Sequence, residues 1–147
     1  MTSRNLLLDA SVRDALRSHA RSGAPREVCG VLIGSRADPD ESDAVRDARP
    51  VPNVAADPRT HYELDPEATL AEIEAAEAAG DDVVGFYHSH PRGPPEPSDT
   101  DRRQATWPGY VYCIVVPGSD EDEEFVVRAW RWTGEAFESL TVEVVDD

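Results

Sequence analysis

Two histidines separated by one residue, His88 and His90, open the segment HSHPRGPPEPSDTD (88–101). Neutral imidazole is a preferred ligand of zinc, and a catalytic zinc is held by three protein ligands with a fourth position left for water. Asp101 closes the segment and is the candidate for the third ligand. Prolines in the spacer restrict its backbone, which lowers the entropy lost when its two ends come together. The segment therefore predicts a zinc site.

Each feature of this segment also has an explanation without a metal. Two histidines at this spacing can occur by chance in a surface turn, since the chain has four histidines. Ser98 and Asp101 fit the S-x-x-D pattern of a helix start, in which the serine caps the helix and no ligand is involved. The coincidence of these features within fourteen residues, at the exit of an apolar strand, favours the metal site.

A hydrolytic zinc site also needs a carboxylate that takes a proton from water and passes it to the leaving group. Glu27 is a candidate because it heads the otherwise apolar run EVCGVLIGS (27–35), and acidic side chains are seldom buried without a reason. The alternative is that Glu27 is the exposed start of a strand. The spacing of the residues alone leaves both interpretations open.

The elements around these residues must bring them together. The run DVVGFYHSH (82–90) is typical of a central strand, and because side chains alternate with a period of two, His88 and His90 point to the same face. The segment 97–107 is typical of a helix with Ser98 as N-cap and Asp101 in its first turn. The carboxyl end of a strand is where open α/β sheets generally place their ligands.

The rest of the chain mixes helices with strands and then ends in strands. Helices are expected over 9–23 and 65–80, the second with Leu70 and Ile73 on one face. This order predicts an α/β or α+β domain with a mixed sheet, in a three-layer arrangement. Further strands are expected over 5–9, 27–35, 110–118, 123–133 and 137–145, and 44–51 is expected at a sheet edge.

Length and charge restrict the class of protein. The 147 residues are expected to form a single domain, 1–147. Thirty acidic residues stand against 14 basic ones, all arginine, and the formal net charge of −16 argues against nucleic acid and anionic membranes as partners. The acidic composition is typical of a halophilic protein. The start MTSRNLLLD is neither a signal peptide nor a membrane span, so a cytoplasmic location is expected.

Other residues that can do chemistry have simpler expected roles. Cys29 and Cys113 lie in apolar runs without a zinc-ligand partner at the right spacing, so both are expected to be buried thiols. His19 is expected on a helix surface. His61, in the loop 52–61, is either solvated or in contact with substrate. The tryptophans are expected to pack in or over the core: Trp107, Trp130 and Trp132.

Taken together, the site residues resemble the signature of the JAMM (MPN+) metalloproteases. That signature is a glutamate, then H-[S/T]-H and, after seven residues, S-x-x-D; here it is Glu27, HSH (88–90), Ser98 and Asp101. The flanking runs PREVCGVLIG, VVGFYHSHP and PSDTD are similar as well, and the resemblance extends from the first helix through RAWRW. It implies a curved mixed sheet flanked by helices, with a cytidine-deaminase-like architecture.

The resemblance also implies a role for each site residue. His88, His90 and Asp101 would hold one Zn²⁺ per chain. Glu27 would polarise the attacking water, and the Ser98 hydroxyl would hold the negative charge that develops on the scissile carbonyl.

Members of this family cleave isopeptide or peptide bonds after the C-terminal glycines of ubiquitin or ubiquitin-like modifiers. The acidic composition places the chain among archaeal forms that remove small ubiquitin-like modifiers from the lysines of conjugates, cutting after Gly-Gly. The loop 52–61 is expected to cover the substrate tail, which could add to a sheet edge as a strand. The absence of lysine would spare the enzyme itself from such modification.

Three other functions compete with this interpretation. A relative with the same site chemistry would trim the C-terminus of a sulfur-carrier protein, and a scaffold of the same fold would bind partners without catalysis. A zinc nucleobase deaminase is rejected, because Ser89 stands where its H-x-E motif needs glutamate and the chain has no C-x-x-C. The sequence indicates neither an oligomeric state nor which modifier is the substrate.

Overall fold

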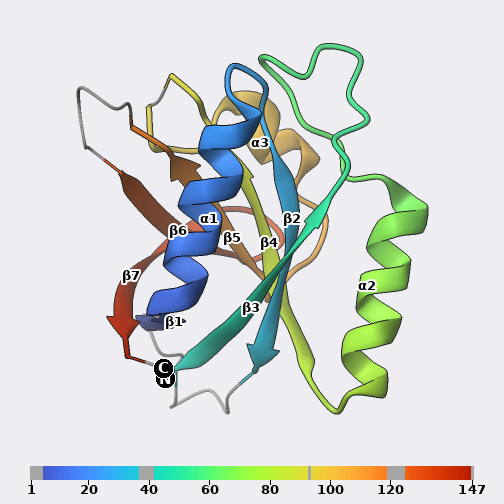
Figure 1. Cartoon of the computed structure of the whole chain (residues 1–147), viewed down its shortest axis with the longest axis vertical. Helices are drawn as coiled ribbons and strands as arrows, with labels where there is room; N and C mark the ends of the chain where they lie inside the picture. The colour runs from blue at the N-terminus through green and yellow to red at the C-terminus, as the bar shows by residue number, and fades with distance from the viewer. Residues whose placement is uncertain (1–4, 37–41, 93, 119–124, 147) are drawn as a thin grey trace.

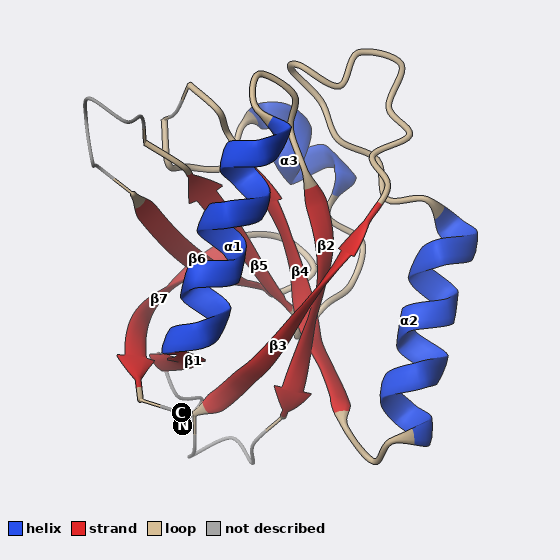
Figure 2. Ribbon diagram, in the orientation of Figure 1, coloured by secondary structure: helices blue, strands red, loops and turns tan. Residues whose placement is uncertain are grey.

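Seven strands and three helices are present in the part of the chain that the computed structural model describes, residues 5–36, 42–92, 94–118 and 125–146 (Figures 1 and 2). The strands are β1 (Asn5–Asp9), β2 (Cys29–Ser35), β3 (Asp43–Val51), β4 (Asp82–Ser89), β5 (Val111–Val116), β6 (Val126–Trp132) and β7 (Phe137–Val145). The helices are α1 (Ala10–Gly23), α2 (Pro66–Ala78) and α3 (Asp99–Gln104). The expected order of elements is confirmed, although the first residues of the strand expected over 123–133 lie outside the described ranges. None of the helices in these ranges is long and apolar enough to cross a membrane.

The strands form a closed ring in the order β1-β3-β2-β4-β5-β6-β7. β1 closes it by pairing in parallel with two strands, so that Leu6 lies opposite Asp43 of β3 and opposite Val142 of β7. β4 and β5 are also parallel, and the remaining neighbours are antiparallel. The mixed sheet is therefore confirmed, whereas its closure was not part of the expectation.

The expectation of an edge strand over 44–51 is wrong. β3 pairs with β2 along its length, from Ala44 opposite Ser35 to Val51 opposite Cys29. Its first residues, 43–45, pair with β1 as well. The charged residues of DAVRDARPV indicate that a face of the strand meets water, but exposure of a face does not reveal whether the hydrogen-bonding edges are occupied.

Helices cover both faces of the sheet, as expected. α1 crosses one face (Figure 1) and buries three residues at four-residue spacing there: Val12, Leu16 and Ala20. α2 packs against the other face through small side chains, with Ala76 buried and Ala68 partly buried in the cluster around Phe86. Leu70 lies outside this contact and is 55% exposed.

Most of the residues expected in the core are buried. Cys29 and Cys113 are both free and fully buried, which confirms the expectation for the thiols. Trp130 and Trp132 are buried as well. Trp107 is half exposed and lies over the core, with its ring centroid 6.1 Å from that of Phe86.

His19 is not the surface residue that its place on α1 suggested. Its Nδ1 is 2.8 Å from the hydroxyl oxygen of Tyr87, and the two rings meet edge to face with centroids 5.8 Å apart. Burial lowers the pKa of His19. The helix face that carries it therefore contacts β4, a long-range pairing that helical periodicity alone does not reveal.

Candidate active site

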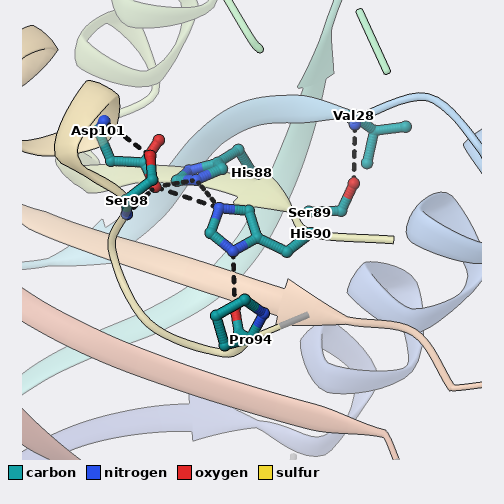
Figure 3. Close-up of polar contacts among 7 residues, drawn as sticks. All are labelled: Val28, His88, Ser89, His90, Pro94, Ser98 and Asp101. Carbon is teal, nitrogen blue, oxygen red and sulfur yellow. Dashed lines mark hydrogen bonds and ion pairs between the residues drawn. The ribbon is translucent and has the colours of Figure 1, made fainter. Parts of the chain in front are cut away.

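The two histidines leave the end of β4 on the same side, as the strand period predicts. Their Nε2 atoms are 3.0 Å apart (Figure 3). His88 is buried, and the Nδ1–H of His90 donates to the carbonyl oxygen of Pro94 at 2.8 Å. That bond selects the neutral tautomer of His90 in which Nε2 carries the lone pair. The Nε2 atom of His90 is therefore available as a metal ligand.

Asp101 reaches the histidines from the first turn of α3. Ser98 and Asp101 form a capping box, in which the Asp101 N–H donates to the Ser98 Oγ at 3.0 Å and the Ser98 N–H donates to the Asp101 Oδ2 at 2.9 Å. The same Oδ2 lies 3.2 Å from the Nε2 of His88 and 3.1 Å from that of His90 (Figure 3). The Asp101 carboxylate therefore both caps the start of α3 and contacts the two histidines.

The three atoms form a triangle of a size that suits a metal ion. Its sides are 3.0, 3.1 and 3.2 Å. Ligands placed tetrahedrally about 2.0–2.1 Å from a zinc ion lie about 3.3 Å from one another. A second possible set exchanges the aspartate for Glu27, since ligand atoms of Glu27, His88 and His90 all lie within 4.8 Å of one another. Both sets share the two histidines.

Glu27 is buried beside this triangle, so the alternative of an exposed strand start is wrong. It precedes β2, which begins at Cys29. Its N–H donates to the carbonyl oxygen of Pro58 at 2.6 Å, and its carbonyl oxygen accepts from the Asn53 Nδ2 at 2.9 Å. Backbone hydrogen bonds to another segment therefore fix the residue, while its carboxylate faces the histidines.

Ser89 links the histidine strand to the segment that carries Glu27. Its Oγ accepts from the N–H of Val28 at 2.8 Å (Figure 3). Its own N–H donates to the Val28 carbonyl oxygen at 2.9 Å. These bonds place the residue after Glu27 against the residue between the two histidines. The side chain between the histidines thus faces the scaffold.

A cavity of about 510 Å³ opens beside the triangle. Glu27, His90 and Ser98 line it, together with the cationic residues Arg59 and Arg92. The loop between β3 and α2, drawn in green, lies at the same end of the molecule as α3 (Figure 1). The side chains that sequence analysis singled out as metal-binding or catalytic thus meet at one solvent-accessible place.

Comparison with known proteins identifies the family. Residues 9–133 match the profile described as prokaryotic homologs of the JAB domain. The chain belongs to this JAB domain family. It is 53% identical over 150 residues to a desampylase from Haloferax volcanii, a match that covers 98% of this chain and 99% of that protein.

Two further proteins are similar over nearly the whole chain. A CysO-cysteine peptidase from Mycobacterium tuberculosis is 34% identical over 141 residues, covering 96% of this chain and 92% of that protein. A solution structure of a Desulfitobacterium hafniense protein superimposes with a TM-score of 0.85 at 25% identity, covering 97% of this chain and 94% of the other. The recognition of the family and of its fold from sequence is confirmed.

In the JAB site, burial and hydrogen bonds to Asp101 set the pKa values of the two histidines. Burial lowers the pKa of His88, which keeps its ring neutral. Burial also acts to lower the pKa of His90, but hydrogen bonds to Asp101 and to the Pro94 carbonyl prevail and raise it. Burial acts to raise the pKa of Asp101, and the hydrogen bonds with the two histidines overcome this and lower it far below its usual range. The aspartate is therefore an anion that attracts cations to the site.

For Glu27 of this JAB domain, the effect of burial on the pKa prevails over the effects of the neighbouring charges. Burial raises the pKa of its carboxyl to about 7, opposed by the charge of His90 and assisted by that of Asp101. A carboxyl with a pKa near neutrality can both accept and return a proton at physiological pH.

Two residues of the JAB site have no signal in the sequence. Tyr62 stacks on His88 with ring centroids 4.0 Å apart. Asn53 binds the backbone of Glu27. Asn53 lies in 52–61, which lacks periodicity and is expected only as a loop over the substrate, and Tyr62 directly follows that loop. His61, next to Tyr62, is exposed, and its Nδ1 is 2.8 Å from the Thr60 Oγ1.

Proposed function

We propose that this chain is a zinc-dependent isopeptidase that removes ubiquitin-like modifier proteins from the lysines of conjugates by cutting after their C-terminal Gly-Gly. The observation that carries the proposal is the triangle of His88, His90 and Asp101, with sides of 3.0, 3.1 and 3.2 Å, beside a buried glutamate. Membership of the JAB domain family and 53% identity to a desampylase support it.

His88, His90 and Asp101 would hold the zinc and leave Glu27 free to move protons. The triangle has nearly the dimensions of three tetrahedral ligands, whereas the set with Glu27 is defined only by distances within 4.8 Å. The lowered pKa of Asp101 also suits a ligand, which must be ionised. When bound there, zinc supplies a Lewis acid that polarises a carbonyl and lowers the pKa of water.

Glu27 would handle the proton of the reaction. It accepts a proton from the water whose oxygen attacks the scissile carbonyl carbon. The bond between that carbon and the lysine nitrogen then breaks, and the same carboxyl returns the proton to the departing amine. Its pKa of about 7, raised by burial, suits both transfers.

Ser98 would stabilise the negative charge on the carbonyl oxygen. Its Oγ accepts the N–H of Asp101, which leaves the hydroxyl proton to be donated elsewhere. The residue lines the same cavity as Glu27 and His90. A donor held at this place before the reaction stabilises the transition state more than the ground state.

The decisive experiment incubates the purified protein at high salt with a ubiquitin-like modifier joined by its terminal glycine to a lysine side chain. We expect about one zinc per chain, cleavage at the glycine, and loss of cleavage with a chelator. Glu27→Ala should abolish turnover and retain zinc, whereas Glu63→Ala, an exposed glutamate of the loop, should behave like the native protein. Full activity of Glu27→Ala would require another base and contradict the mechanism.

A second candidate is the removal of a short C-terminal extension from a sulfur-carrier protein. The 34% identity to a CysO-cysteine peptidase favours it, since that match covers 96% of this chain. The site chemistry would be the same, so substrates alone distinguish the two functions. Cleavage of a modifier–cysteine adduct, together with no cleavage of lysine conjugates, would support this candidate over the first.

A further inference from the structure

Both backbone polar groups of Glu27 are held by the segment 52–64, which lies between β3 and α2. The N–H of Glu27 donates to the Pro58 carbonyl oxygen, and the carbonyl oxygen of Glu27 accepts from the Asn53 side chain. The pairing of β2 with its neighbours begins only at Cys29. Although Val28 is hydrogen-bonded to Ser89 of β4, the two backbone hydrogen bonds of Glu27 itself both go to the loop.

The side chain of Asn53 makes four hydrogen bonds that hold that loop. Its Nδ2 donates to the carbonyl oxygens of Glu27 at 2.9 Å and of His61 at 3.0 Å. Its Oδ1 accepts from the N–H groups of Ala55 at 3.0 Å and of Glu63 at 2.9 Å. These four bonds use the two donors and the two lone pairs of a carboxamide. No other side chain of this size offers the same pattern.

The same segment forms part of the surface that a substrate meets. Arg59 and Thr60 line the cavity, and Tyr62 stacks on His88. Asn53 is half-buried and is not among the residues that line the cavity. One side chain thus joins a wall of the cavity to the backbone of the proposed general base.

We infer that Asn53 is a positioning residue for Glu27. Its carboxamide fastens segment 52–64 to the Glu27 backbone, so that an ordered cavity wall and a correctly placed carboxylate form together. Loss of these bonds releases Glu27 and removes none of the contacts among His88, His90 and Asp101. The inference rests on the proposed function for its catalytic meaning, but its structural part can be tested separately.

The kinetic test uses Asn53→Asp and Asn53→Ala. Aspartate has the same shape, but it places an oxygen against the two carbonyls that the Nδ2 group serves. We expect kcat to fall about a hundredfold, the scale of loss when a catalytic group is displaced by about 1 Å, with zinc content unchanged at saturating zinc. A higher KM can accompany this fall, because the segment also forms a wall of the cavity. A rise in KM with native kcat would overturn the inference, because Asn53 would then shape only the binding wall.

The matched control is Thr133→Ala. The Thr133 hydroxyl also binds loop backbone, accepting from the N–H groups of Glu135 and Ala136, but it lies in the turn between β6 and β7. We expect native kcat in this variant. An equal loss of kcat in Thr133→Ala would mean that general loosening explains the Asn53 result, and would overturn the inference.

Amide exchange tests the structural part without a substrate. In the zinc-loaded protein, Asn53→Ala should speed exchange of the Glu27 N–H by about tenfold, as expected for loss of a hydrogen bond that holds the segment. If the native protein cleaves no modifier conjugate, the proposed function fails, yet the exchange result still decides whether Asn53 holds Glu27. Unchanged exchange at Glu27 would overturn the inference whatever the activity.

Discussion

The phenol ring of Tyr62 lies flat against the imidazole of His88, with ring centroids 4.0 Å apart and planes inclined by 15°. Tyr62 is buried and comes from the loop after β3, whereas His88 lies at the end of β4. The stack restricts rotation of the imidazole and keeps its Nε2 directed toward Asp101. A residue that touches none of the proposed chemistry thus orients one of the proposed ligands.

Replacing Tyr62 by leucine should weaken zinc binding. Leucine keeps an apolar side chain in the buried site but cannot stack, so the His88 ring gains freedom. We expect a loss of about tenfold in affinity, the lower end of the range for outer contacts that orient metal ligands. Competition with a chromogenic chelator at equilibrium measures it. Tyr62→Phe is the control and should bind zinc like the native protein; equal affinity in the leucine variant would show that the stack orients nothing.

Asp101→Asn separates the capping of α3 from the binding of a cation, which are the two roles of the Asp101 side chain. The amide oxygen of asparagine can still accept the Ser98 N–H, so the start of α3 should persist, but the negative charge that a cation needs is lost. We expect zinc content well below one per chain, with the amide of residue 101 still protected from exchange. Asp99→Asn, an exposed acid in the same turn, should keep its zinc. Full zinc in Asp101→Asn would point to Glu27 as the third ligand.

The site could be predicted from sequence to the extent that its signals are local. The strand period places His88 and His90 on one face, and the S-x-x-D pattern marks the start of a helix at Ser98. The place of Glu27 at the head of an apolar run made it a candidate but left its burial open, and only the family signature put it beside the histidines. Of the four bonds of Asn53, the one to Glu27 spans 26 residues along the chain, and none of the four follows from a pattern of residue types.

The fold shows the same limit. The strands could be predicted because the hydrophobic pattern of each is contained within about ten residues, and α3 because its start is marked by the S-x-x-D pattern. The closure of the sheet depends on β1 pairing with β7, for example Asn5 opposite Thr141, and no local pattern specifies partners at that distance. The expected edge strand over 44–51 was wrong for the same reason.

Cys29 and Cys113 are buried, so their thiols should react only when the protein unfolds. Burial raises the pKa of Cys29 and of Cys113 to about 12, from the ordinary thiol value of 9.0. The folded protein therefore holds these protons more tightly than the unfolded chain. The resulting contribution to stability is complete below pH 9 and is lost as the pH rises toward 12.

We therefore expect native protein to resist iodoacetamide at pH 8, because the thiolate is the reactive form. In denaturant, both cysteines should be alkylated, and intact mass counts the adducts. The metal-free protein serves as a second sample, since it reports whether zinc limits access to Cys29, two residues from Glu27. Rapid alkylation of native protein would show that one thiol is exposed or that the surrounding strands open readily.

The formal net charge of −16 should make stability depend on salt. Like charges on the surface repel one another, and the Debye length falls from about 10 Å at 0.1 M salt to about 3 Å at 1 M. We expect the melting temperature to rise between these concentrations of KCl, by about 2–4 °C for each kcal/mol gained. The matched variant replaces three exposed acids of α2 by glutamine, Glu67, Glu74 and Glu77, and should show a shallower dependence. If the native protein and this variant respond to salt with the same slope, surface repulsion is not the cause, and the acidic composition gives no support for work at high salt.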